Sequence, residues 1–227
     1  NTILCKSSAT NPHKRINACT WLLNSDELSQ ERYFVIHNYR GLAYRKKGLN
    51  DQAIQDYDEA IRLEPMFAAA YYNRAFVYSE KGLHDQGIRD LDEVIRLKPN
   101  LTTAYSSRAF AYFKKGLYDQ AIRDYGEVIR LMPDNVVAYL ARALSYSKKG
   151  LYDLAILDID QAIRLKPNDA SAYRLRGEVH SNKGLYDRAI RDYNQALRLE
   201  PEFAQAYKSR GYYHRDKGHY DRAIQDF

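Results

Sequence analysis

The histidines are the first residues to test for chemistry, because the imidazole ring titrates near neutral pH and is a common metal ligand. The chain has six, and none belongs to a His-Glu-x-x-His pattern or lies near a pair of cysteines. No glycine-rich phosphate-binding loop is present. Four histidines stand where tyrosine stands in other copies of a 34-residue period: His37, His84, His180 and His214. We therefore expect no catalytic residue, no metal site and no cofactor.

An arginine and an aspartate recur once in every period. They are Arg40, Arg74, Arg108, Arg142, Arg176 and Arg210, with Asp56, Asp90, Asp124, Asp158, Asp192 and Asp226. A catalytic pair would appear once, so six copies indicate architecture. We expect an Arg–Asp ladder, because the guanidinium fork suits a carboxylate. The pairs named for it are Arg74 with Asp90, Arg108 with Asp124, and Arg142 with Asp158. The alternative is that the arginines capture an acidic ligand.

The period itself is set by glycine and proline. The glycines are Gly48, Gly82, Gly116, Gly150, Gly184 and Gly218, and the prolines are Pro65, Pro99, Pro133, Pro167 and Pro201. Each follows the previous one by 34 residues, and further columns of lysine and aspartate keep the same step. Chance does not produce so many matched columns, so the chain is built from an internal repeat.

Each period predicts two helices. In the second copy Tyr71, Ala75 and Tyr78 give a helical apolar stripe that ends at Gly82. A second stripe follows and ends at Pro99, since proline lacks the amide hydrogen that a helix needs. Neither helix can bury its apolar face alone, so neighbouring copies must stack. The pattern predicts an all-α fold of helix-turn-helix units.

One copy carries a family resemblance. Its key residues are Tyr105, Ala109, Tyr112, Gly116, Ala121, Tyr125 and Pro133. They resemble the signature of the tetratricopeptide repeat, which implies a right-handed superhelical solenoid. The resemblance covers 34–227, as five full repeats and a truncated sixth: 34–67, 68–101, 102–135, 136–169, 170–203 and 204–227. Departures are local, among them Gly87 in a column of alanines.

The same resemblance implies where a partner binds. In this family the first helix of each repeat lines a concave groove, and the residues that vary along it are candidates for recognition. They are Tyr72, Asn73, Phe76, Ser106, Phe110, Phe113, Leu140, Leu144, Arg174, Glu178, Lys208 and Tyr212. They predict an apolar, aromatic middle and a charged C-terminal end. The alternative is that the phenylalanines only pack between helices. A clamp for a C-terminal carboxylate is not expected, because only Asn73 matches it.

Residues 1–33 do not follow the period. Asn11 and Pro12 predict a helix start, and an apolar stripe then favours a capping helix over the first repeat. Cys5 and Cys19 could form a disulfide in an oxidising compartment or remain unlinked thiols. Residues 16–29 resemble a stretch of exported bacterial proteins of this repeat class. We therefore expect a periplasmic or otherwise exported protein, with the cytoplasm as the alternative. A first residue other than Met suggests a removed leader or a trimmed chain.

The expected function is a non-enzymatic protein–protein interaction module that binds a protein or peptide in the groove. The net charge of +6 comes from interleaved charges, and no apolar run suggests a membrane span. Alternatives are a docking domain of a longer enzyme or lipoprotein, and binding of RNA. Nucleic acid is disfavoured because the 21 tyrosines largely occupy packing columns, and no small-molecule substrate is expected. Self-association is a further expectation, through an uncapped last helix around Ile224 and Phe227.

Overall fold

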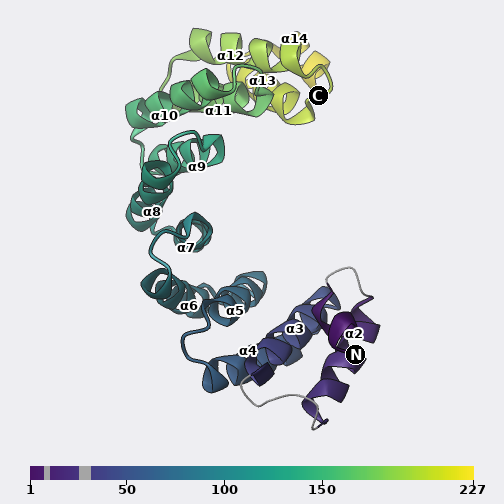
Figure 1. Ribbon diagram of the computed structural model, residues 1–227. Helices are drawn as coiled ribbons and strands as arrows, with labels where there is room; N and C mark the ends of the chain where they lie inside the picture. Colours follow the sequence, from purple (N-terminus) through teal and green to yellow (C-terminus); the bar gives the residue numbers. More distant parts are fainter. Residues whose placement is uncertain (8–10, 26–31) are drawn as a thin grey trace. The chain divides into compact units, whose positions relative to one another are not determined.

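The computed structural model describes residues 1–7, 11–25 and 32–227 (Figure 1). Every regular element within those ranges is helical, which confirms the predicted all-α fold. The predicted N-terminal segment 1–33 includes 8–10 and 26–31, which lie outside the described residues, as does the end of the stretch 16–29. The chain divides into two compact units, 1–115 and 116–227, and each is described by itself.

Unit 1 begins with two helices outside the repeat pattern and continues with helix pairs. The two N-terminal helices are α1 (Thr2–Lys6) and α2 (Pro12–Leu23). The others are α3 (Tyr33–Lys46), α4 (Asn50–Leu63), α5 (Ala68–Glu80), α6 (His84–Leu97) and α7 (Thr102–Lys114). The starts and ends of α5 and α6 agree with those expected from the apolar stripes. Consecutive helices of the pairs pack against each other along the unit.

Unit 2 repeats the same plan. Its helices are α8 (Tyr118–Leu131), α9 (Val136–Lys148), α10 (Tyr152–Leu165), α11 (Ala170–Asn182), α12 (Tyr186–Leu199), α13 (Ala204–Asp216) and α14 (Tyr220–Asp226). Its largest apolar cluster is built by α9, α10 and α11 around Ile159 and Val179, both fully buried. The two helices of this repeat, α9 and α10, therefore share one core with α11, the helix that follows.

The turn inside each repeat is fixed by glycine. Gly48 and Gly82 both have φ of 73°, in the left-handed region that residues with a side chain rarely adopt. In the first turn Leu49 N donates to Tyr44 O at 3.0 Å and Gly48 N to Arg45 O at 2.9 Å. These bonds satisfy the last carbonyls of α3 and reverse the chain into α4. The glycines that recur every 34 residues therefore mark the C-terminal ends of the first helices.

Close approach of the paired helices depends on small residues. A Cβ atom on Gly41 of α3 would lie 2.6 Å from Tyr57 Cε1 of α4, so only glycine fits there. Tyr57 is completely buried as a result. Gly177 and Tyr193 have the same relationship in unit 2, with the same distance of 2.6 Å. The tyrosine of the second helix thus lies directly on the backbone of the first.

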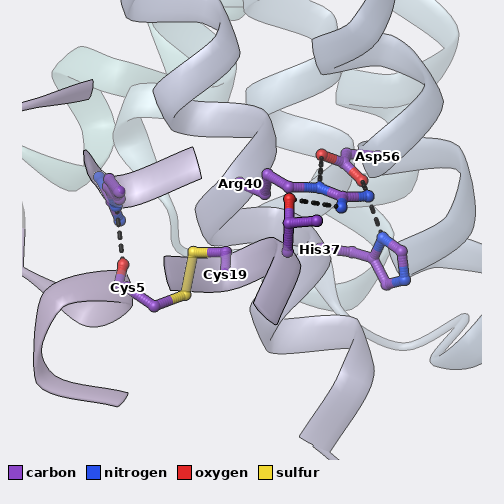
Figure 2. Close-up of a disulfide and its surroundings, with 7 residues drawn as sticks. Cys5, Cys19, His37, Arg40 and Asp56 are labelled. Atoms are coloured by element: carbon purple, nitrogen blue, oxygen red, sulfur yellow. Dashed lines mark hydrogen bonds and ion pairs between the residues drawn. A yellow bond between two sulfur atoms is a disulfide. The ribbon is translucent and has the colours of Figure 1, made fainter. Parts of the chain in front are cut away.

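The N-terminal helices cover the first repeat of unit 1. Asn11 caps α2 by accepting a hydrogen bond from His13 N at 2.9 Å. Cys5 of α1 and Cys19 of α2 form a disulfide and are fully buried beside Ile36 of α3 (Figure 2). The buried Arg15 donates from Nε to Cys5 O at 2.8 Å. Both helices contact α3, so α1 is a second covering helix in addition to the single one expected.

Candidate functional site

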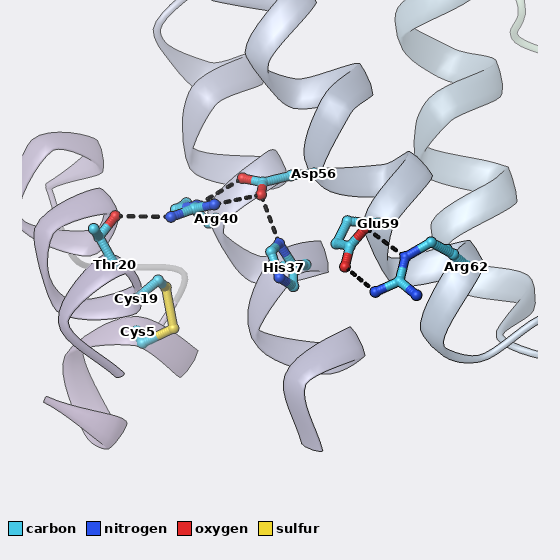
Figure 3. Close-up of polar contacts among 8 residues, drawn as sticks. All are labelled: Cys5, Cys19, Thr20, His37, Arg40, Asp56, Glu59 and Arg62. Atoms are coloured by element: carbon cyan, nitrogen blue, oxygen red, sulfur yellow. Dashed lines mark hydrogen bonds and ion pairs between the residues drawn. A yellow bond between two sulfur atoms is a disulfide. The ribbon is translucent and has the colours of Figure 1, made fainter. Parts of the chain in front are cut away.

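The arginine and aspartate columns meet within each repeat of unit 1. Arg40 Nε donates to Asp56 Oδ2 at 2.9 Å and its Nη2 to Oδ1 at 2.8 Å (Figure 3). His37 Nδ1 lies 2.8 Å from the same carboxylate, and Arg40 Nη1 reaches Thr20 of α2 at 3.1 Å. Thr20 thereby links the N-terminal helices to the first repeat. Arg74 makes the same two bonds to Asp90, at 2.8 and 2.6 Å.

Unit 2 contains the same pairs. Arg142 Nε donates to Asp158 Oδ2 at 2.7 Å, and this hydrogen bond raises the pKa of the Arg142 guanidinium. Arg176 pairs with Asp192 at 2.6 Å and Arg210 with Asp226 at 2.5 Å. Of the remaining predicted pair, Arg108 belongs to unit 1, where it binds Asp92, and Asp124 is a buried residue of unit 2. Since the ladder carboxylates occupy these guanidinium groups, the pairs do not favour capture of an acidic ligand.

A second carboxylate column was missed from the sequence. Arg74 Nη1 also donates to Asp58 of the preceding repeat at 2.5 Å. Arg108 contacts Asp92 at 2.6 Å and Arg176 contacts Asp160 at 2.7 Å in the same way. Each of these arginines therefore joins two consecutive repeats. The signal was visible in the sequence, since Asp58, Asp92 and Asp160 keep the 34-residue register, with Gly126 and Asn194 as the interruptions.

The predicted aromatic residues of unit 1 border a pocket between α5, α6 and α7. Its volume is about 450 Å³. Its lining residues are Tyr72, Ala75, Phe76, Ser79, Glu80, His84, Gly87, Leu91, Ser106, Ser107, Phe110 and Ala111. Phe76 is 43% exposed and Phe110 is 46% exposed, and both line the same pocket, so their apolar surfaces are adjacent instead of scattered. The structure thus gathers Tyr72, Phe76, Ser106 and Phe110 at one site.

Part of this pocket was not anticipated. His84, Gly87 and Leu91 come from α6, whereas the sequence interpretation considered first helices only. Gly87 departs from a column of alanines, and it contributes to the pocket as well as to the fold. A Cβ atom there would lie 3.2 Å from Ala75 O, so the glycine lets α6 lie close to the backbone of α5 at this wall of the pocket.

Two cations flank the pocket. The Arg45 guanidinium of α3 lies 4.2 Å from the centre of the Phe76 ring, and Lys114 Nζ lies 5.3 Å from that of Phe110. Neither cation has a carboxylate within ion-pairing distance in the described part of the chain. Glu80 lines the pocket near the C-terminal end of α5. The pocket is therefore apolar inside and positive beside its phenylalanines.

Asn73 and Phe113 do not line this pocket. Asn73 Nδ2 donates to Asn38 Oδ1 at 2.8 Å, which joins α5 to α3. The amide of Asn73 thus has a structural partner in Asn38. Phe113 is half-buried near the end of α7.

The charged end of the predicted groove lies in unit 2, beside a polar cleft of about 730 Å³. Leu144, Glu178 and Tyr212 line this cleft, whereas Leu140 packs on the apolar cluster of α9 to α11. Arg174 forms an ion pair with Glu178, which also accepts a hydrogen bond from Ser209 at 3.2 Å. The two charges compensate each other. Lys208 is exposed, with Nζ 5.7 Å from the Tyr212 ring centre.

The described ranges contain no cluster of three His, Cys, Asp or Glu side chains placed to hold a metal ion. None of the helices within them is both long and apolar enough to cross a membrane. Two of the histidines within the repeats contact the Arg–Asp ladder. His37 and His180 each lie within hydrogen-bonding distance of a ladder aspartate.

Comparison with known families and structures accounts for this repeated architecture. A family model described as TPR repeat matches residues 41–82 and 111–150. Two models described as tetratricopeptide repeat match 174–227 in one case, and 68–101 with 136–169 in the other. No curated protein sequence matches the chain.

Among solved structures, MamA is 27% identical, with 77% of this chain and 95% of MamA covered and a TM-score of 0.71. A tetratricopeptide repeat protein from Parabacteroides merdae ATCC 43184 is 20% identical over 95% of this chain and 84% of that one, with a TM-score of 0.76. YrrB, described as a TPR protein with an unusual peptide-binding site, is 16% identical over 84% and 96% of the two chains, with a TM-score of 0.69.

Proposed function

Because the chain belongs to the tetratricopeptide repeat family and is thus a protein–protein interaction module, we propose that the pocket of unit 1 holds an apolar side chain of a partner peptide. The observation that carries the proposal is the exposure of Phe76 and Phe110 beside a preformed apolar pocket. YrrB is a family relative with a peptide-binding site, and at 16% identity the comparison supports the shared fold alone.

The pocket suits a large apolar anchor. Burying an aromatic or branched aliphatic side chain between two phenylalanines removes apolar surface from water on both sides, which contributes about 25 cal/mol per Å². Interface residues of this kind commonly dominate binding energy. The hydroxyl groups of Ser106 and Ser107 provide hydrogen-bonding groups for the peptide backbone at the edge of the pocket.

The charged side chains beside the pocket determine which peptide residue can stand next to the apolar anchor. Arg45 lies over the Phe76 ring and has no carboxylate partner among the described residues, so an acidic residue of the peptide can pair with it. Glu80, which lines the pocket, would repel an acidic residue placed beside it. The proposed partner therefore presents an apolar anchor with an Asp or Glu on the Arg45 side.

A phage-displayed library of random 12-residue peptides tests this without a known partner. Selection on the wild-type protein should enrich peptides that share a large apolar residue beside Asp or Glu. Their synthetic versions should bind about tenfold more weakly to Phe76→Ala and Phe110→Ala, since each change removes ~1–2 kcal/mol of contact. Phe113→Ala is the matched control, because this residue of the same helix lies outside the pocket, and it should bind like the wild type.

Two results would refute the proposal. One is enrichment of peptides with no shared apolar residue, and the other is unchanged affinity of the selected peptides for both pocket variants. Preferential binding of single-stranded RNA to the same residues would instead favour the RNA alternative.

The proposal extends to location and to chemistry. Cys5 and Cys19 are joined and fully buried, which suits a protein that folds in an oxidising compartment such as the bacterial periplasm. The chain acts in this proposal by binding alone and without catalysis of its own. Alkylation of the unreduced, denatured protein isolated from its native cell should leave both cysteines unlabelled. Labelling of both would argue for the cytoplasm.

A further inference from the structure

A second cleft of unit 2 lies on the opposite side of α11 from Arg174 and Glu178. It has a volume of about 420 Å³ and runs between α11 and α12. Arg176 and His180 border it from α11, and these positions are displaced by about 200° around the helix from Arg174 and Glu178. Four arginines but only one carboxylate line it: Arg176, Arg188, Arg191, Arg198 and Asp192.

The single carboxylate is already engaged. Asp192 is buried, receives the hydrogen bonds of Arg176 and lies 2.7 Å from His180 Nδ1. Arg176 is in turn compensated by Asp160 at 2.7 Å. Asp192 therefore does not balance the three exposed arginines of α12. Asp187 is the other carboxylate nearby, next to Arg188 at the start of the helix.

Arg188 and Arg198 differ from their counterparts in the first three repeats, and the fourth repeat already has Gln161 beside Arg164. Arg62, Arg96 and Arg130 each pair with a glutamate three residues earlier, at 2.5 to 2.9 Å. In the fifth repeat a glutamine, Gln195, stands at the position of that glutamate. Arg198 makes no ion pair with any described residue. Arg188 replaces a glutamine that stands at positions 52, 86 and 120. Like Arg198, Arg188 and Arg191 have no ion-pair partner in the described ranges.

A substitution on α11 shapes the cleft. His180 stands where Tyr78, Tyr112 and Tyr146 stand in other repeats, and it turns toward Asp192. His180 is a smaller side chain than tyrosine, and it is buried beside Asp192. Loss of a glutamate, gain of an arginine and this smaller side chain thus coincide in one repeat.

We propose that this cleft binds an acidic segment of a protein partner, as a site separate from the pocket of unit 1. Arg188 and Arg198 are ten residues apart on α12, which corresponds to about 15 Å along the helix. A single phosphate group cannot contact both ends of that distance, whereas a chain with several Asp or Glu residues can. Exposed guanidinium groups pair with such carboxylates through two parallel hydrogen bonds.

The probe is a fluorescent 12-residue peptide in which Glu alternates with Gly, measured by anisotropy in low salt and in 0.15 M NaCl. The wild-type protein should bind it, and binding should weaken with salt because exposed charges are screened over about 8 Å at physiological ionic strength. The variant with Arg188→Gln, Arg191→Gln and Arg198→Gln should lose about tenfold in affinity or more.

The matched control removes equal charge from other second helices: Arg89→Gln, Arg123→Gln and Arg130→Gln. It should bind the peptide within about twofold of the wild type. Equal losses in both variants would show attraction by net charge alone and overturn the proposal. Tighter binding of a single-stranded RNA of equal charge, with the same dependence on Arg188, would overturn it in favour of nucleic acid. Displacement of the peptide by millimolar inorganic phosphate would overturn it in favour of a simple anion site.

Discussion

Arg142 Nη1 lies 3.6 Å from the position that a Cβ atom would occupy on Gly126. In the other repeats Asp58, Asp92 and Asp160 stand in this column, and each binds the arginine of the following helix. Among the described residues, the carboxylate partner of Arg142 is Asp158 alone, at 2.7 and 2.8 Å. The joint between α8 and α9 therefore lacks an ion pair that neighbouring joints possess.

Restoring that carboxylate should stabilise unit 2. Gly126→Asp adds an acceptor within reach of Arg142 and also removes a glycine from the interior of α8. Gly126→Asn is the matched control, because it has the same shape without the charge. We expect Gly126→Asp to exceed Gly126→Asn by about 0.5–1 kcal/mol in the free energy of unfolding, as for a partly exposed ion pair. Urea unfolding in low salt and in 1 M NaCl measures this. A difference that does not shrink in high salt would contradict the ion-pair explanation.

Removing the remaining partner of Arg142 should be costly. Asp158→Asn leaves the guanidinium without a carboxylate among the described residues, and we expect a loss of about 3 kcal/mol, as for a broken buried pair. Asp58→Asn should cost less than about 1 kcal/mol, since Asp58 is 52% exposed and Arg74 keeps Asp90. Native-state hydrogen exchange of the flanking helices gives both values. Equal costs would show that burial does not decide the strength of these pairs.

The disulfide should hold the N-terminal helices on the first repeat. The cross-link joins residues 14 positions apart, and a loop of this length contributes about 3 kcal/mol by restricting the unfolded chain. Cys5→Ala with Cys19→Ala should therefore speed hydrogen exchange of α1 and α2 amides strongly. The α12 amides serve as the internal control and should be unaffected. Unchanged exchange of α2 would mean that packing against α3 suffices to hold it.

His214 should make unit 2 sensitive to acid. Burial lowers the pKa of this histidine below its ordinary value, and its Nδ1 has no hydrogen-bond partner among the described groups. The unfolded chain then takes up a proton at higher pH than the folded chain does, so stability falls as the pH drops below about 6.5. His214→Tyr restores the residue of Tyr44 and Tyr78. Its melting temperature should fall less than that of the wild type between pH 7.5 and 5.0, and an equal fall would exclude His214 as the cause.

The features that recur in every repeat could be predicted from the sequence. The helix ends at Gly48 and Gly82 follow from local backbone preference, and the Arg–Asp pairs within a repeat follow from two columns of opposite charge. The ion pair between Asp58 and Arg74, which links two repeats, also has a signal in the sequence. Recognising it requires knowing that α4 and α5 place these two residues side by side.

The pockets were harder to predict because they depend on departures from the repeat. Phe76 and Phe110 could be named from variable columns of the first helices. The contribution of Gly87 could not, since the effect of a missing methyl group depends on which helix faces it. That Arg198 has no ion-pair partner among the described residues likewise becomes apparent only when its surroundings are known.

The distances along the chain between partners have an evolutionary consequence. Lys81 pairs with Asp51 and Lys115 with Asp85, both 30 residues apart, and Arg74 and Arg108 each reach an aspartate 16 residues earlier. Deletion of residues 68–101 would place Asp51 at the offset from Lys115 that Asp85 now holds. Recombination between copies can therefore shorten or lengthen the protein by whole repeats without inventing a new contact, although a deletion of residues 68–101 also removes most of the residues that line the pocket of unit 1.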